Sequence, residues 1–235
     1  MASKVNQAQE VHQGKHGCRF CEEVGCDRPS SPWNSPLFQS PHFVVIPSLG
    51  SLISGWLLIV PREHFLSTAV LPPSLIEEMD CLKRAVARVV AQEFAPGWAF
   101  EHGPAAHKRA VGCGVDHAHV HVVPLRFDLV EAATPFLPYD VRFRPGTMET
   151  CREYVLRGYD YLYAESPTGD CVVAGSPRFG SQVFRKAIAH RYRKFKEYRW
   201  SNYPQFDNVS VTISRLQSNS LDTSLVGDPA EIVST

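Results

Sequence analysis

Three histidines, His117, His119 and His121, alternate with small or branched apolar residues near the middle of the chain. A period of two is typical of a strand, so the apolar residues are predicted to face the core and the imidazoles to share the other face. Same-face neighbours lie about 7 Å apart, which lets three imidazoles contact one substrate. A neutral imidazole is a nucleophile near pH 7 that can carry a phosphoryl group. The run therefore predicts covalent catalysis, with a simple metal-binding tract as the alternative.

A second candidate site lies near the N-terminus, where Cys18 and Cys21 form a Cys-x-x-Cys pair and Cys26 follows five residues later. Two thiolates at this spacing can bind one tetrahedral zinc ion, but such a site needs two more ligands. A thioredoxin-like redox pair is the alternative, although the loop-like residues 27–32 do not supply its strand-to-helix context. The pair alone leaves both interpretations open.

Several elements are predicted to position these residues. Segments 42–46 and 52–60 read as strands separated by a turn at 47–50. Apolar residues at three- and four-residue steps predict a core-packing helix over 75–94, with Ser74 as N-cap and Glu77 completing a capping box. A short strand is expected at 98–100. It leads into a Gly- and Pro-bearing loop, 101–114, where backbone N–H groups can approach an anion.

The sequence after Pro124 changes in character. Segment 128–145 reads as irregular, 159–163 and 171–173 as a hairpin, and 209–213 as a strand. Residues 181–196 read as a strongly basic helix, which is typical of a solvated face, with phosphate or nucleic-acid binding as the alternative. A disordered tail is expected from about residue 216.

Composition narrows the classes of function. The 235 residues carry 24 basic and 24 acidic side chains, so no net charge favours nucleic acid or an anionic membrane as partner. The apolar runs are too short to span a bilayer, and the polar N-terminus lacks the apolar region of a secretory signal. Seven cysteines without the spacing of a disulfide framework favour reduced thiols and a cytoplasmic location.

The segment from Cys18 to Pro124 resembles the histidine triad family, whose motif is the same alternation of three histidines with apolar residues. The other family components occur here in order: Cys-x-x-Cys, a Gly-containing strand ending in Pro-x-x-His at residues 61–64, a helix, and the triad. The resemblance implies a zinc ion held by four residues, Cys18, Cys21, His64 and His117. A Cys2His2 set fills the coordination sphere of zinc, so this ion would be structural.

The resemblance also assigns roles to the remaining histidines. It implies that His119 attacks the α-phosphorus of a nucleotide, forming a nucleotidyl-imidazole that water then hydrolyses. The second ring nitrogen of His119 is expected to donate to a backbone carbonyl, and His121 to bind a phosphate oxygen. His117 is the third member of this catalytic set. Transferase branches of the superfamily have Gln at the third position, so His121 favours hydrolysis.

The sequence departs from the family pattern in two places. Gly114 stands where many members have Ser, and Glu101-His102-Gly103 stands where an Asn-x-Gly phosphate loop is usual. Protonation of the leaving group then falls to His102, His107 or a water molecule. The substrate-binding candidates are Glu101, His102, Gly103, His107, Gly112 and Gly114.

These observations predict an α+β protein of the histidine triad type, with an antiparallel sheet, packed helices and an N-terminal zinc knuckle. The expected organisation is a flexible segment 1–14, a catalytic domain 15–145, an extension 146–215 packed on it, and the tail 216–235. The predicted activity is hydrolysis at the α-phosphate of a dinucleoside polyphosphate, nucleoside phosphoramidate or similar substrate. A nucleotidyltransferase and a non-catalytic nucleotide sensor are the alternatives, and a homodimer is the family habit.

Overall fold

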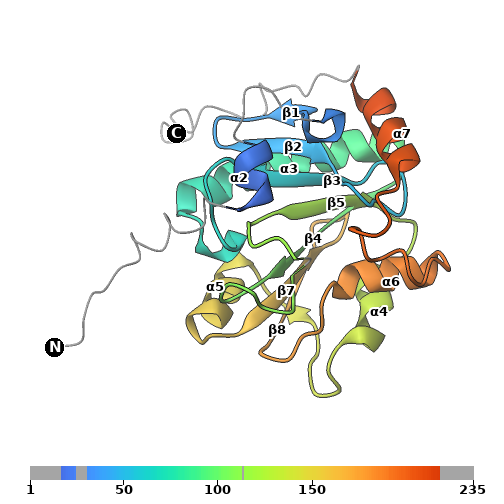
Figure 1. The fold of residues 1–235 in the computed structure, drawn as a ribbon. Helices are drawn as coiled ribbons and strands as arrows, with labels where there is room; N and C mark the ends of the chain where they lie inside the picture. The colour runs from blue at the N-terminus through green and yellow to red at the C-terminus, as the bar shows by residue number, and fades with distance from the viewer. Residues whose placement is uncertain (1–16, 25–30, 113, 218–235) are drawn as a thin grey trace.

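One antiparallel sheet forms the centre of the structure, a computed structural model that describes residues 17–24, 31–112 and 114–217 (Figure 1). Within those residues, eight strands are hydrogen-bonded in the order β1-β2-β3-β5-β4-β7-β8-β6. Every neighbouring pair is antiparallel. The predicted class, an antiparallel sheet with packed helices, is confirmed. The predictions for Cys26, for residues 1–14 and for most of the tail lie outside the described residues.

The strands are β1 (Phe38–Gln39), β2 (Phe43–Pro47), β3 (Leu57–Pro61), β4 (Gly97–Gly103), β5 (Val120–Pro124), β6 (Arg144–Pro145), β7 (Asp160–Glu165) and β8 (Cys171–Ser176). The helices are α2 (Arg19–Glu23), α3 (Pro73–Glu93), α4 (Leu129–Ala133), α5 (Met148–Leu156), α6 (Val183–Arg191) and α7 (Phe206–Leu216). Three short 3₁₀ turns are η1 (Pro32–Asn34), η2 (Thr68–Val70) and η3 (Thr134–Phe136). No helix in this part of the chain combines the length and apolar character needed to cross a membrane.

Alternating side chains divide the core between the two faces of the sheet. Val120 and Val122 of β5 pack with the apolar stripe of α3 on one face. Val123, from the same strand, packs on the opposite face with residues of α4 and α6. Because both faces are covered, every residue of β5 is buried, including His121.

The N-terminal elements were predicted with their order right and some boundaries wrong. β3 begins at Leu57 rather than at 52, because Gly55 adopts a φ of +88° and interrupts the extended chain. The helix predicted over 75–94 spans Pro73–Glu93, with Pro72 rather than Ser74 at its N-cap. Backbone N–H groups in the first turn of a helix have no acceptor within the helix. Proline, which lacks this N–H, is therefore favoured there.

Three predictions for the C-terminal part are wrong. The strand expected at 209–213 is part of α7, which buries Val209, Thr212 and Leu216 at helical spacing. The basic helix expected over 181–196 ends at Arg191, and the segment expected to be irregular contains α4. The hairpin is confirmed as β7 and β8, joined by a turn at 166–170.

The C-terminal half of the chain extends the same sheet instead of packing only against it. β7 pairs with β4 along five residues of each strand, so β4 has neighbours on both sides. The two edges of the described sheet, β1 and β6, are each two residues long. Such short edges offer little backbone for pairing with another sheet.

We predict that Gly103→Ala destabilises the protein by about 3 kcal/mol, at the upper end of the range for overpacked cores. A Cβ atom at Gly103 would lie 2.0 Å from Cζ of Tyr161, its partner across the β4–β7 pair. Urea unfolding monitored by circular dichroism measures the effect. Gly112→Ala is the matched control, because its Cβ would be 4.0 Å from the nearest atom. Equal stability of the two variants would contradict this view of the β4–β7 contact.

Candidate functional site

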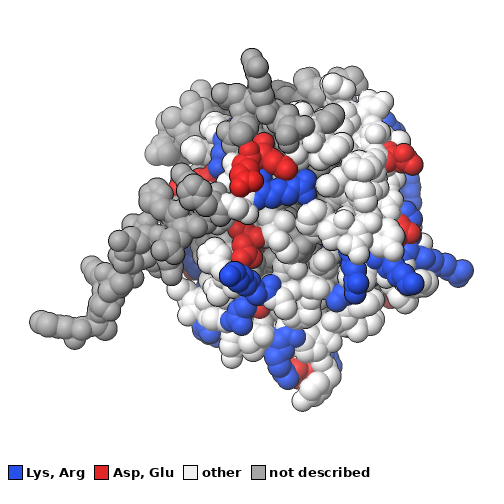
Figure 2. All heavy atoms as spheres, in the orientation of Figure 1, with Lys and Arg blue, Asp and Glu red and all other residues white. Residues whose placement is uncertain are grey.

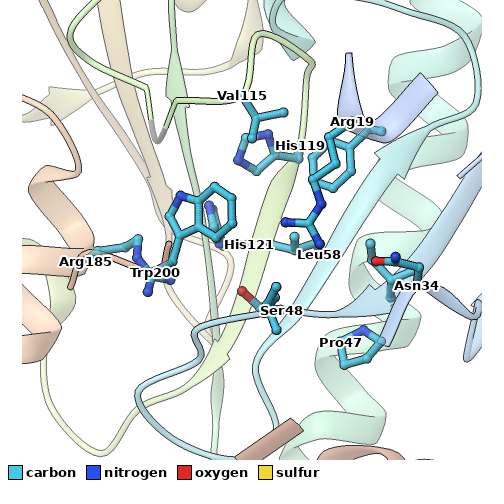
Figure 3. A pocket seen from close by; sticks show the side chains of 13 residues that line it. Arg19, Asn34, Pro47, Ser48, Leu58, Val115, His119, His121, Arg185 and Trp200 are labelled. Carbon is cyan, nitrogen blue, oxygen red and sulfur yellow. The ribbon is translucent and has the colours of Figure 1, made fainter. Parts of the chain in front are cut away.

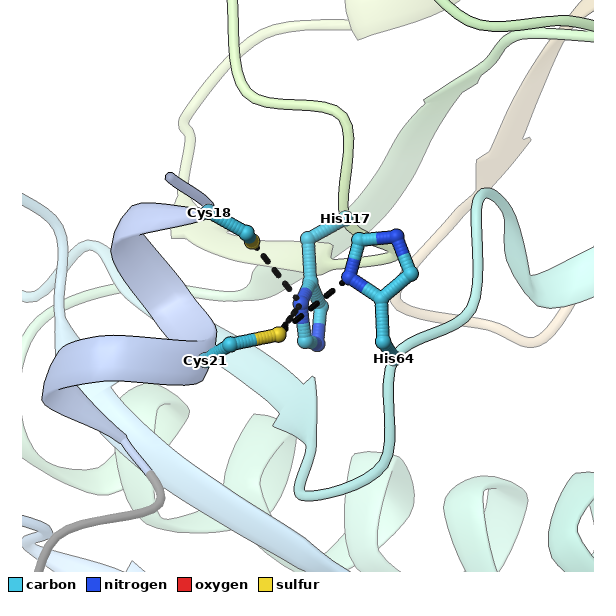
Figure 4. Close-up of side chains that lie close together, drawn as sticks. All are labelled: Cys18, Cys21, His64 and His117. Carbon is cyan, nitrogen blue, oxygen red and sulfur yellow. Dashed lines mark hydrogen bonds between the residues drawn. The ribbon is translucent and has the colours of Figure 1, made fainter. Parts of the chain in front are cut away.

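The four residues implied as zinc ligands lie together between α2, the end of β3 and the start of β5 (Figure 4). Their ligand atoms all lie within 4.8 Å of one another. Nδ1 of His117 is 3.4 Å from Sγ of Cys18 and 3.6 Å from Sγ of Cys21. Nδ1 of His64 is 3.2 Å from Sγ of Cys21. The predicted quartet is confirmed as a spatial cluster, although its members are up to 99 residues apart.

The donor set and its spacing fit zinc. Around a tetrahedral zinc ion, with bonds of about 2.0–2.3 Å, neighbouring ligand atoms lie roughly 3.3–3.8 Å apart. Nε2 of His117 lies 2.9 Å from the carbonyl oxygen of Pro61, which can only accept, so Nδ1 carries the lone pair that a metal needs. Burial lowers the pKa of His64, and lowers that of His117 to about 4, which favours the neutral, ligating form. The cluster therefore suits a structural Cys2His2 zinc site.

His119 is held in one tautomer by the backbone of the preceding histidine. Its Nδ1 lies 2.7 Å from the carbonyl oxygen of His117, so the proton resides on Nδ1 and the lone pair on Nε2. The ring of Phe20, which lies between the two cysteines of the knuckle, packs edge-on against both His117 and His119 at 5.6 Å between ring centroids. The predicted hydrogen bond of His119 to a backbone carbonyl is confirmed.

His121 is held in the opposite tautomer by Trp56 of the segment before β3. The indole Nε1 donates to Nδ1 of His121 at 3.0 Å, so the proton of the neutral imidazole must be on Nε2. This Nε2 is buried and has no hydrogen-bond partner among the described residues. Burial, with the charges of nearby His119, His102 and Arg185, lowers the pKa of His121 well below its usual range. The ring is thus a neutral donor.

A small cavity brings the two histidines together with residues from both ends of the chain (Figure 3). Its lining includes His119, His121, Arg19 of α2, Arg185 of α6 and Trp200. None of the described residues that line it is acidic. Arg19 also pairs with Glu23, which does not line the cavity. Two guanidinium groups and an N–H donor in the lining suit an anionic ligand such as a phosphate. The strand alternation is only partly regular here, since β5 begins at Val120, after His119.

Residues 101–103, predicted as a phosphate-binding loop, belong to β4 and do not line this cavity. The Glu101 carboxylate accepts hydrogen bonds from the backbone N–H of Thr68 at 2.9 Å, from the Thr68 hydroxyl, and from Tyr161 at 2.5 Å. Burial raises the pKa of Glu101, which these hydrogen bonds oppose. Nε2 of His102 accepts from the backbone N–H of Phe184 at 3.1 Å, and burial lowers its pKa to about 3. These residues connect β4 to the C-terminal half.

The other predicted substrate-binding residues also lie away from the cavity lining. His107 is half exposed, with Nδ1 3.4 Å from a carboxylate oxygen of Asp116 and its ring stacked on His64. Gly112 and Gly114 lie in the loop between β4 and β5, where Gly114 has a φ of +88°. Their roles toward a substrate stay predictions.

Four residues of the site were not identified from the sequence: Arg19, Trp56, Arg185 and Trp200. Arg185 is only 1% exposed, its guanidinium lies 4.9 Å from the Trp56 ring, and Trp200 is half-buried. The cluster of basic residues around 181–196 was a signal, but it did not distinguish Arg185 from its exposed neighbours. Figure 2 shows basic and acidic side chains interspersed over the visible face rather than gathered into one basic surface.

No family model matches this sequence, and no curated protein matches it. Several solved structures do. One is a zinc-bound histidine triad family protein from Mycobacterium smegmatis, 26% identical, covering 48% of this chain and 78% of that one with a TM-score of 0.38. A member of the HIT family from Bacillus subtilis is 20% identical, covering 46% and 72% with a TM-score of 0.38. This chain is similar to histidine triad proteins. Yeast Ap4A phosphorylase Apa2 is 10% identical, covering 58% and 59% with a TM-score of 0.34.

We predict that the purified protein carries about one zinc ion per chain and that Cys21→Ser removes most of it. Sγ of Cys21 is in contact with both histidine ligands, so its loss leaves an incomplete coordination sphere. Because metal binding contributes to folding, the variant should also unfold at a lower temperature. Elemental analysis by mass spectrometry and thermal unfolding measure the two effects. Cys81→Ser, at a half-buried cysteine outside the cluster, should retain the metal; full zinc in Cys21→Ser would exclude this site.

Proposed function

We propose that this chain is a histidine triad hydrolase that cleaves nucleotidyl substrates at the α-phosphate through a covalent intermediate on His119. The observation that carries this proposal is the pair of opposite tautomers in one cavity. His119 holds its proton on Nδ1 against the carbonyl of His117, and His121 holds its proton on Nε2 because Trp56 donates to Nδ1. One ring is arranged as a nucleophile and the next as a hydrogen-bond donor.

In the first step, the lone pair on Nε2 of His119 forms a bond to the α-phosphorus, and the bond from phosphorus to the leaving group breaks. The leaving group departs with that electron pair. The imidazole, which then carries positive charge, is stabilised by the carbonyl oxygen of His117, which accepts from Nδ1 at 2.7 Å. The product of this step is a nucleotidyl-histidine.

The charge that develops on the nonbridging phosphate oxygens needs donors that are already oriented. The Nε2–H group of His121, buried and without a partner among the described residues, can donate to one of these oxygens. The guanidinium groups of Arg19 and Arg185 line the same cavity and add positive charge. Fixed donors in a site with little water stabilise such charge at little reorganisation cost.

In the second step, a water oxygen attacks the same phosphorus, the P–N bond returns its electrons to Nε2, and the water loses a proton as the nucleoside monophosphate leaves. The buried ring of His102 accepts a hydrogen bond from the backbone N–H of Phe184. Neither His102 nor His107 lines the cavity. Among the three proton sources expected from the sequence, water therefore fits best for the leaving group.

The metal site contributes to this chemistry through position. A zinc ion bound there would hold the knuckle against the start of β5. His117 connects the metal cluster to the nucleophile. Its Nδ1 belongs to the cluster, and its backbone carbonyl accepts the hydrogen bond from His119. Phe20 from the knuckle packs on the same two rings. Loss of the metal site should therefore disturb the orientation of the nucleophile.

Two alternatives share part of this mechanism. A nucleotidyltransferase has the same first step but uses a second substrate in place of water, whereas a nucleotide sensor only binds the nucleotide. The proposal of hydrolysis rests on His121, which stands where transferase branches have Gln. The homodimer and the cytoplasmic location predicted from the sequence stay proposals as well. The two-residue edges of the described sheet favour contacts through helices or loops if a dimer forms.

We predict that a nucleoside monophosphate adduct accumulates on the wild type and not on His119→Ala. Intact-mass spectrometry after rapid quenching detects it, using dinucleoside polyphosphates and adenosine phosphoramidate as substrates. His190→Ala, at an exposed histidine of α6, is the matched control and should form the adduct normally. Turnover should fall at least about a thousandfold in His119→Ala, in keeping with loss of a covalent nucleophile.

An adduct on His119→Ala, or normal turnover by it, would exclude His119 as the nucleophile. Nucleotide binding by the wild type without an adduct or turnover on any substrate would instead support the sensor. Turnover only in the presence of an added acceptor phosphate or sugar phosphate would support the transferase.

We predict that Trp56→Phe lowers kcat about 10–100-fold, the usual cost of losing a group that orients an active-site imidazole. The phenyl ring keeps the packing against Phe100, whose centroid lies 5.9 Å from that of Trp56, but cannot donate to His121. His121 can then adopt the other tautomer and lose the donor on Nε2. Steady-state kinetics measure the change. Trp98→Phe, in the same core cluster, is the control, and equal kcat in the two variants would argue against a role for the indole donor.

A further inference from the structure

We propose that Trp200, in the segment between α6 and α7, forms a movable wall of the nucleotide site and stacks against the nucleobase of the substrate. This inference rests on the proposed function, because it takes the α-phosphate to lie at His119 and His121. It assigns a substrate-binding role to the C-terminal extension, and it identifies the ligand as a nucleotide recognised through its planar base.

The placement of Trp200 is the first observation. Its side chain lines the same cavity as His119 and His121, and Figure 3 shows the indole in front of His121 and beside His119. Most residues that line this cavity are buried, whereas four of them, Arg19, Leu49, Val115 and Trp200, are half-buried. Trp200 and Arg19 are the two aromatic or charged side chains in this half-buried group.

The backbone at Trp200 is anchored to the β2–β3 loop, so the movement proposed here is that of the indole ring about its side-chain torsions. A Cβ atom at Gly50 would lie 2.5 Å from Cβ of Trp200, so only glycine allows this approach. The N–H of Gly50 donates to the carbonyl of Pro204 at 2.7 Å. Arg185 donates through Nη2 to the carbonyl of Gly50 at 2.6 Å and through Nε to that of Tyr198 at 3.0 Å. These contacts bind the segment around Trp200 to the loop that borders the site.

The size of the cavity indicates that this wall must move. Its volume is about 40 Å³, which holds only a few water molecules. Ligand pockets for molecules of nucleotide size are roughly 300–1,000 Å³. The guanidinium carbon of Arg19 lies 5.3 Å from the centre of the Trp200 ring, and both side chains line the cavity beside the histidines. At this separation the two groups contact each other, so a base can lie between them only if they move apart.

The chemistry of the pair identifies which part of the nucleotide it receives. An indole and a guanidinium both present planar faces, on which nucleobases stack in proteins. Indole has a single donor and no charge, so it offers little to a phosphate. The phosphate instead suits the N–H of His121 and the positive charge of Arg185, which lie deeper. We therefore place the base between Trp200 and Arg19, with the α-phosphate at the histidines.

The test compares ligands with and without a base on the zinc-loaded, full-length protein. Adenosine and guanosine 5′-monophosphate are titrated alongside ribose 5-phosphate by calorimetry, for the wild type, Trp200→Ala and Trp200→Phe. We expect Trp200→Ala to weaken nucleoside monophosphate binding at least about fivefold, as for other base–aromatic contacts. Ribose 5-phosphate should bind equally to all three proteins, and Trp200→Phe should retain most of the affinity for the nucleotides.

Intrinsic fluorescence gives a second reading that does not depend on catalysis. Stacking of a base on Trp200 should quench part of the emission of the wild type, and Trp200→Phe should abolish this change. Trp33→Phe is the matched control, because Trp33 is also half-buried but contacts Phe206 of α7 instead of the cavity. It should show the same quenching as the wild type.

Each outcome has one meaning. Unchanged nucleotide affinity in Trp200→Ala, or quenching that persists in Trp200→Phe, overturns the role of Trp200 and leaves the proposed function intact. Equal weakening of the nucleotides and ribose 5-phosphate shows that Trp200 only maintains the fold, which also overturns it. If the wild type binds no nucleotide but is folded and zinc-loaded, both this inference and the proposed function fail.

Discussion

The hydrogen bond from His119 to the carbonyl of His117 links the two sites of this protein. His117 is fixed at both ring nitrogens, with Nε2 against Pro61 and Nδ1 in the metal cluster. Its carbonyl is thereby held where it sets the tautomer of His119. In the proposed mechanism, the nucleophile lies two residues from a ligand of the metal cluster and gains its orientation from the same short stretch of backbone. In the proposed mechanism, a metal with no open coordination position would act on the chemistry through this stretch of backbone.

The tautomer and charge state of His121 are set by a different constraint, which is burial among aromatic rings. His121 stacks on Phe100 at 4.4 Å between ring centroids and accepts from Trp56, and both residues belong to the core. In such a place a charged imidazole is costly, so the ring stays neutral and acts as a donor. The two adjacent histidines of the triad therefore reach opposite tautomers from one alternating sequence, because one meets a carbonyl acceptor and the other an indole donor.

The features predicted correctly from the sequence were those encoded by local pattern or by the resemblance. The alternation around His121 located β5, the three- and four-residue steps located α3, and the family motif brought four distant metal ligands together. The predictions that failed depended on tertiary contacts. Glu101 was predicted as a substrate-binding residue of a loop, but it lies in β4, where Thr68 and Tyr161 satisfy its carboxylate inside the sheet. Arg185 looks like its exposed basic neighbours, and only the packing of α6 shows that it is buried.

Contacts between the N-terminal and C-terminal halves of the chain show that the two share one sheet. The boundary predicted at residue 145 divides the sequence, but β7 lies against β4 and continues its sheet beyond that point. Phe184 satisfies His102, and Arg185 reaches the β2–β3 loop that borders the cavity. Without the C-terminal half, β4 would expose a seven-residue edge, and the cavity would lose a cation and an aromatic wall. The C-terminal half therefore belongs to the structure of the site as much as the triad strand does.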